Sequence, residues 1–189
     1  FAEAHGLDKV RIDINAPLLA DPLRQSLQQG QTPRLEVTSN SMAPLLRQGD
    51  LVLLEAVTPE QLTRGDVITL FSASQIMTHR YWGRDAETRT GRLLTRGDRP
   101  LAFDTPWPPD ALIGRMIGRS RQERVLCLTT AAGHRLNDHL CWLAGIEFKW
   151  WGNRVNGATP TRHQGFRRAL RGAIYAWATF ITGILGLMA

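Results

Sequence analysis

Gly49-Asp50-Leu51-Val52-Leu53-Leu54 and Gly65-Asp66-Val67-Ile68-Thr69-Leu70-Phe71 are two copies of one pattern, a Gly-Asp pair followed at once by a mainly apolar run. A third pair, Gly97-Asp98, follows the stretch 92–95. Glycine allows the positive φ of a tight turn, and aspartate can bond the turn backbone, so each pair marks a place where a strand starts or turns. This pattern is typical of an antiparallel β-sheet.

Further strand-like runs lie around these turns, and glycine and proline separate them. They occupy residues 35–38, 76–82, 92–95, 111–118 and 125–128. We therefore predict that residues 34–130 form a mainly β domain, folded as a coiled antiparallel β-sheet or a small barrel.

The two ends of the chain differ from the strand-like region in their sequence pattern. Residues 1–33 mix helix-like and polar segments, which predicts an N-terminal helical or irregular segment. Residues 134–189 form a predicted helical region, because apolar residues recur there at three- and four-residue intervals. Its tail, 172–189, is apolar apart from Thr179 and Thr182 and would reach about 27 Å as a helix, close to the thickness of a bilayer core. We expect this tail to associate with a membrane; the alternative is a helix packed on the sheet.

The charge balance supports the membrane expectation. The chain has 23 Lys and Arg residues against 17 Asp and Glu, a net charge of +6, and Lys9 and Lys149 are its only lysines. The arginines are scattered except for one cluster, which precedes the apolar tail and consists of Arg162, Arg167, Arg168 and Arg171. Basic residues beside an apolar segment are typical of membrane association, so we expect no nucleic-acid partner.

Cysteine and histidine provide no convincing metal site. Cys127 and Cys141 have His134 and His139 between them, but this spacing matches none of the usual zinc patterns. Two cysteines also make no disulfide framework in a chain of this length. We predict reduced thiols, no metal and no cofactor.

A serine and a histidine are the residues that indicate chemistry. Ser41 lies in Ser39-Asn40-Ser41-Met42-Ala43-Pro44, a predicted turn, and His79 lies in the strand-like run 76–82. A serine hydroxyl is a poor nucleophile until a base removes its proton, and imidazole is suited to that task near neutral pH. The alternatives are a turn-capping serine and a half-buried strand histidine.

These residues resemble the motifs of type I signal peptidases, which share a β-fold with the LexA-type self-cleaving repressors. The resemblance runs from about residue 38 to 118 and consists of motifs in the family's order. They are Ser39-Asn40-Ser41-Met42-Ala43-Pro44, Gly49-Asp50-Leu51-Val52, Gly65-Asp66-Val67-Ile68, His79-Arg80, Arg96-Gly97-Asp98 and Ile113-Gly114-Arg115. The resemblance implies a fold of the signal-peptidase/LexA type for the β domain.

The resemblance also implies roles for single residues. Most members use a lysine base, but both lysines here lie outside the matching region, and His79 falls where the endoplasmic-reticulum and SipW-like branch has its histidine. That branch carries an aspartate at the position of Asp104. The implied catalytic residues are therefore Ser41 as nucleophile, His79 as general base and Asp104 as the group that orients His79. Asp98 is the alternative third member, or a support for the site.

The Ser41 turn is expected to supply more than the nucleophile. Its backbone N–H and the hydroxyl of Ser39 match the family's oxyanion donors. Asn40 replaces the family's glycine, and asparagine tolerates a left-handed backbone better than most residues. Met42 and Pro44 are expected to lie beside the substrate groove.

Together these features predict a serine endopeptidase that cleaves a leader or signal peptide from a peptide or protein precursor. The resemblance implies small residues before the cleavage point. Two other functions stay open: a non-catalytic peptide- or membrane-binding module that kept the fold, and a LexA-like self-cleaving regulator. We expect a location at the bacterial inner membrane. The arginine cluster favours a cytoplasmic catalytic domain, whereas the resemblance favours an external one.

Overall fold

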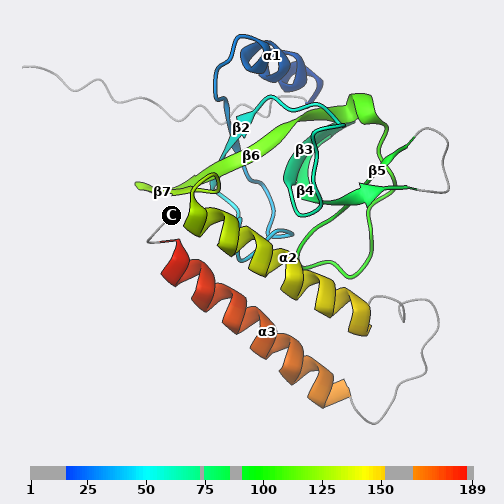
Figure 1. Cartoon of the computed structure of the whole chain (residues 1–189), viewed down its shortest axis with the longest axis vertical. Helices are drawn as coiled ribbons and strands as arrows, with labels where there is room; N and C mark the ends of the chain where they lie inside the picture. Colours follow the sequence, from blue (N-terminus) through cyan, green and yellow to red (C-terminus); the bar gives the residue numbers. More distant parts are fainter. Residues whose placement is uncertain (1–15, 73–74, 86–90, 152–163, 187–189) are drawn as a thin grey trace, which may run out of the picture.

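The computed structural model describes residues 16–72, 75–85, 91–151 and 164–186. Seven strands form one antiparallel sheet in the order β1-β2-β6-β3-β4-β5, and β7 pairs with β6 (Figure 1). The strands are β1 (Arg34–Glu36), β2 (Leu51–Glu55), β3 (Val67–Ser72), β4 (Gln75–Arg84), β5 (Leu93–Arg96), β6 (Leu112–Arg121) and β7 (Arg124–Cys127). This confirms the prediction of a mainly β chain with an antiparallel sheet.

The sheet is strongly irregular. Register shifts interrupt three pairings, at Leu53/Leu54 in β2, Thr69/Leu70 in β3 and Tyr81/Gly83 in β4. Such bulges bend a strand and increase its twist, which explains a coiled sheet. Among the described strands the path is open, with β1 and β5 at its two ends. The predicted alternative of a closed small barrel is therefore not what these strands form.

Three α-helices cover the sheet. Helix α1 (Ala16–Gln28) lies on one side, and α2 (Ala131–Trp151) and α3 (Gln164–Leu185) run antiparallel to each other on the other side (Figure 1). A short 3-10 helix, η1 (Pro109–Ala111), leads into β6. The strands all lie inside the range 34–130 predicted for the β domain, and helices precede and follow them.

Two apolar clusters hold these layers together. The larger one joins the sheet to all three helices and includes Leu27, Leu54, Met116, Leu136 and Ala178. The smaller one lies on β3, β4 and β5, with Ile68, Leu70, Tyr81 and Leu93 packed around Trp107. Helix α3 is thus part of the packed core, because Ala178 is only 5% exposed.

The C-terminal tail forms most of α3. None of the described helices combines the length and the apolar character needed to cross a bilayer. Residue Arg162 and residues 187–189 lie outside the described residues, as do the side chains of Arg167 and Arg168. The association of this tail with a membrane stays a prediction.

Candidate active site

Ser41 begins a turn between β1 and β2 that is anchored in the protein core. The neighbouring side chains of Met42, Leu45 and Leu46 are at most 1% exposed, whereas Ser41 itself is only half-buried. The carbonyl oxygen of Ser41 accepts a hydrogen bond from the backbone N–H of Arg99 at 2.9 Å. The buried neighbours and the backbone hydrogen bond from Arg99 therefore fix the backbone of Ser41, from which its hydroxyl projects.

His79 approaches Ser41 from the middle of the sheet. It lies on β4 opposite Ile68 of β3, and it is 7% exposed. Its Nε2 atom is 2.9 Å from Ser41 Oγ, although 38 positions separate the two residues in the sequence. The fold thus brings the predicted nucleophile and the predicted base within hydrogen-bonding distance.

Asp104 completes the arrangement on the other side of the imidazole. Its Oδ2 atom is 2.6 Å from His79 Nδ1 and also accepts a hydrogen bond from Thr95 Oγ1 at 2.7 Å. The Asp104 N–H donates to the carbonyl of Thr95, which fixes the loop after β5. Because an ionised carboxylate only accepts, His79 Nδ1 is the donor, and His79 Nε2 is left to accept the Ser41 proton.

This arrangement has the chemistry of a general-base-activated alcohol. The exposed fraction of the side chain is 9% for His79 and 17% for Asp104, so water competes little for their hydrogen bond. The carboxylate fixes the imidazole tautomer and would stabilise an imidazolium formed beside it. The three residues that the sequence analysis singled out for catalysis are therefore brought together.

Ser39 lies beside the candidate nucleophile. Its Oγ atom is 3.2 Å from Ser41 Oγ and 3.5 Å from the backbone nitrogen of Ser41. The longer contact is a weak hydrogen bond, so the N–H of Ser41 is only loosely engaged, and the hydroxyl of Ser39 is free to rotate toward an oxyanion.

Asn40 holds the turn without a left-handed backbone. The described non-glycine residue with a positive φ is Gln122, so Asn40 does not use the conformational freedom that the sequence analysis assigned to it. Its side-chain Oδ1 instead accepts a hydrogen bond from the Gln48 N–H at 3.1 Å. The side chain of Asn40 therefore stabilises the turn through this hydrogen bond.

Asp98 is paired with Arg80, whereas the carboxylate bonded to His79 is that of Asp104. Both carboxylate oxygens of Asp98 accept hydrogen bonds from Arg80, at 2.7 and 2.8 Å. Arg80 is completely buried and also donates to the carbonyl of Gly65 and to Asn137 Oδ1 of α2, each at 2.7 Å. Burial opposes the charge of Arg80, but Asp98 outweighs it, and the pKa of Arg80 is raised. The alternative role of Asp98 as third catalytic member is therefore corrected.

Arg96 forms a second buried support, which the sequence analysis missed. It is fully buried, and its guanidinium lies 4.8 Å from the Trp82 ring centroid and 5.0 Å from that of Phe148. It also donates to the carbonyl of Ala144, and burial lowers its pKa. Arg96 therefore ties the end of β5 to α2, next to the loop that carries Asp104.

Gly97 allows the loop after β5 to touch the Ser41 turn. A Cβ atom at this position would lie 2.9 Å from the carbonyl oxygen of Ser41 and 2.8 Å from Pro100 Cδ. Both distances are shorter than real Cβ contacts, so only glycine fits. The Gly-Asp pair in the sequence marks this position, but it predicts a turn and not a close contact with Ser41.

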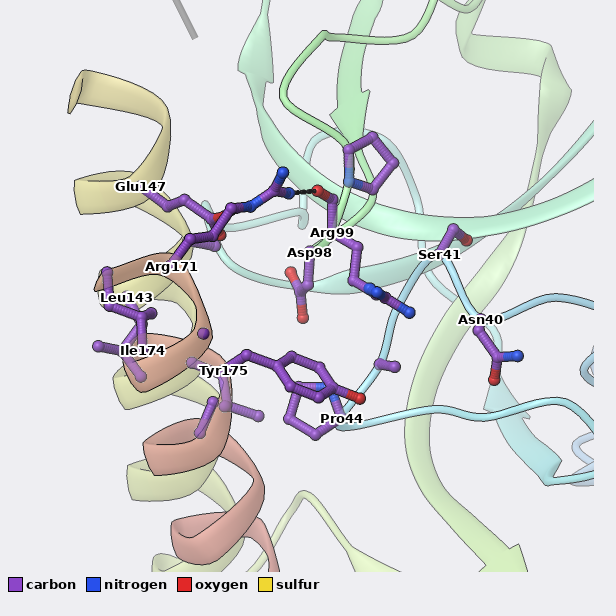
Figure 2. Close-up of a pocket in the computed structure, with 16 residues that line it drawn as sticks. Asn40, Ser41, Pro44, Asp98, Arg99, Leu143, Glu147, Arg171, Ile174 and Tyr175 are labelled. Carbon is purple, nitrogen blue, oxygen red and sulfur yellow. Dashed lines mark hydrogen bonds and ion pairs between the residues drawn. The ribbon is translucent and has the colours of Figure 1, made fainter. Parts of the chain in front are cut away.

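A pocket of about 600 Å³ adjoins the candidate nucleophile (Figure 2). Ser41 and Pro44 form one wall of it, and α2 and α3 form the opposite wall. Pro44 thus lines a pocket beside Ser41, and its place in a substrate groove stays a prediction. Met42 does not line this pocket: it is 1% exposed and packs in the larger core cluster, so its assignment to the groove is corrected.

The cysteines and the described histidines other than His79 lie apart from this site. Cys127 and Cys141 are free thiols, and Cys127 Sγ is 3.0 Å from Thr129 Oγ1. His139 accepts a hydrogen bond from Trp177 Nε1 on α3. Within the part of the chain that the structure describes, no three histidine, cysteine or acidic residues are grouped to hold a metal ion.

Comparison with known proteins adds no relative. No family model, curated protein or solved structure matches this chain. The interpretation of the site therefore depends on its own geometry and chemistry.

Proposed function

We propose that this protein is a serine endopeptidase with a Ser41–His79–Asp104 triad, resembling type I signal peptidases in its motifs, and that its β-sheet is of the signal-peptidase/LexA type. The observation that carries the proposal is the pair of hydrogen bonds on His79, 2.9 Å to Ser41 Oγ and 2.6 Å to Asp104 Oδ2. A satisfied structural histidine needs neither a half-exposed serine on one nitrogen nor a carboxylate on the other. Together they form the arrangement that activates a hydroxyl.

The chemistry follows from the positions of the protons. His79 Nε2 takes the Ser41 proton while Ser41 Oγ bonds to the scissile carbonyl carbon, and the negative charge moves to the carbonyl oxygen. The Ser41 N–H and the Ser39 hydroxyl stabilise that oxygen. The C–N bond then breaks as His79 gives the proton to the leaving amine. Water, deprotonated by His79, hydrolyses the acyl-enzyme and restores Ser41.

The substrate class comes from the shape of the site and from the resemblance. Ser41 borders a pocket on the surface, so a peptide segment in extended form can reach it, held by backbone hydrogen bonds along the Ser41 turn and β4. We propose a peptide or protein precursor from which a leader or signal peptide is cleaved.

A cleavage assay with matched serine variants tests this proposal. The full chain is incubated with precursor-like peptides, and the products are identified by mass spectrometry. We expect Ser41→Ala to lower the rate roughly 10⁴-fold or more, and Ser120→Ala, at a serine of β6 outside the site, to leave it unchanged. Equal binding without cleavage would favour a peptide-binding module, and cleavage of the chain by itself would favour a self-cleaving regulator.

We also propose that α3 lies on a membrane surface. Trp177, Phe180 and Ile184 are spaced three to four residues apart on this helix and are 44–56% exposed. Exposed large apolar side chains in a row are typical of an interaction surface. The basic chain, with its net charge of +6, would favour an anionic lipid surface.

A further inference from the structure

The pocket beside Ser41 combines loops of the candidate active site with the C-terminal helices. Pro44 comes from the Ser41 turn, Leu143 comes from α2, and Ile174 and Tyr175 come from α3 (Figure 2). Helix α3 therefore builds one wall of a cavity whose opposite wall carries the candidate nucleophile.

The inner surface of this pocket is mainly apolar, because most of its charged groups are already paired. Asp98 is bonded to Arg80. Glu147 is bonded to Arg171, which also donates to the carbonyl oxygen of Arg99. The guanidinium of Arg99 lies over the Tyr175 ring, 5.2 Å from its centroid. What remains for a ligand is chiefly aliphatic and aromatic surface.

The size of the pocket exceeds what a small side chain requires. Its volume of about 600 Å³ falls within the range of pockets that bind small organic ligands, about 300–1,000 Å³. An alanine methyl group would leave most of this space to water, whereas an aromatic or large aliphatic side chain would bury its surface against Leu143, Ile174 and Tyr175.

We infer that this pocket is a specificity subsite that takes a bulky apolar side chain of the substrate, close to the cleaved bond, and that α3 determines its size. The inference rests on the proposed peptidase function and adds a substrate class to it. The contact of Arg171 with Glu147 and with the Arg99 carbonyl attaches α3 to the loop after β5. Helix α3, which forms this wall of the subsite, is therefore fixed in position relative to Ser41.

A peptide library measures the preference directly. The full chain is incubated, without lipid, with peptides randomised around a fixed core, and the positions flanking each cleaved bond are read by mass spectrometry. We expect one position near the cleaved bond to favour Leu, Met, Phe or Trp over Ala. Full burial of such a side chain corresponds to at least about a tenfold gain in kcat/KM.

Two glycines of α3 provide a matched pair of variants. A Cβ atom added at Gly172, which lines the pocket, meets no atom within 4 Å, and the same holds for Gly183, which does not line it. Both Gly→Leu changes favour the helix. Two peptides are compared that differ only at the preferred position, one with a bulky apolar residue there and one with alanine. Gly172→Leu is expected to lower kcat/KM about tenfold for the bulky peptide and less than about twofold for the alanine peptide. Gly183→Leu is expected to change neither. Tyr175→Ala, which removes a wall, is expected to reduce the preference for aromatic side chains.

The outcomes separate the subsite from the proposed function. Cleavage without any preference for bulky apolar residues, or with equal losses for both peptides in Gly172→Leu, would overturn the subsite and leave the peptidase intact. No cleavage of any library peptide by the folded wild-type chain would overturn the peptidase and the subsite with it.

Discussion

At the scale of single residues, Asp104 determines which nitrogen of His79 carries the proton. Asp104→Asn offers an amide that is able to donate to Nδ1, which would place the imidazole proton on Nε2, where Ser41 needs an acceptor. We expect peptide cleavage to fall about 10³- to 10⁴-fold with little loss of folding stability. Cleavage rates measure the activity, and circular dichroism measures the folding stability. The control is Asp110→Asn, an exposed aspartate on η1, and an Asp104→Asn protein with wild-type activity would contradict the assignment.

Asp98 contributes to folding stability, because its carboxylate neutralises the buried Arg80. Asp98→Asn leaves the charge of Arg80 without its carboxylate in a place where no water reaches it. Removing one partner of such a pair costs about 3–5 kcal/mol, which denaturant unfolding should detect. Glu60→Gln breaks the exposed contact with Arg84 and is expected to leave the unfolding midpoint unchanged.

The sequence predicts the candidate catalytic residues better than the buried arginine contacts beside them. Ser41, His79 and Asp104 belong to motifs whose order is visible in the chain, and the structure brings them together. The partners of Arg80 and Arg96 could not be predicted, because Asn137 and Phe148 belong to α2 and only the packing of α2 on the sheet brings them near. Long-range contacts of this kind leave no local pattern.

At the scale of elements, the Gly97 contact couples the loop after β5 to the Ser41 turn. Gly97→Ala would push a methyl group against the Ser41 carbonyl and displace the nucleophile. A displacement of about 1 Å is expected to lower cleavage on the order of a hundredfold. Gly145→Ala on α2 is the control, since its added Cβ has only ordinary contacts, the nearest at 3.6 Å. Equal activity of both variants would show that the two loops are not coupled.

The Gly-Asp turns make the strands predictable, whereas the predicted start of the C-terminal helical region, residue 134, is later than the observed start of α2. The strand-like run 76–82 lies inside β4, and 111–118 overlaps most of β6. Helix α2 begins at Ala131, where Thr130 Oγ1 accepts a hydrogen bond from the Gly133 N–H. Threonine caps of this kind are a recognised signal. Helix α3 begins at Gln164, inside the range 134–189 that the sequence predicts to be helical.

At the scale of the whole molecule, α3 has two faces with different surroundings. One face packs on α2 and lines the pocket beside Ser41. The other exposes Trp177, Phe180 and Ile184, and between Ala169 and Leu185 the only charged residue is Arg171, which is paired with Glu147. A membrane bound to the outer face would lie on the same helix that shapes the candidate substrate pocket.

Vesicle flotation tests the membrane contact. We expect the full chain to float with vesicles that contain anionic lipid, more weakly with neutral ones, and to lose most of this binding in Trp177→Ser/Phe180→Ser. Val125→Ser on β7, which removes another exposed apolar side chain, is the control. Flotation that is the same for the double variant and the wild type would place the lipid contact elsewhere.

The most direct test of the Ser41–His79 pairing is covalent labelling with an alkyl fluorophosphonate, which reacts with activated serines. Digestion and mass spectrometry then identify the labelled residue. We predict one adduct on Ser41 in the wild-type chain, formed at least about a hundredfold more slowly in His79→Ala, while His134→Ala reacts at the wild-type rate. A folded protein that forms no adduct on Ser41, or forms it equally fast without His79, would contradict the account.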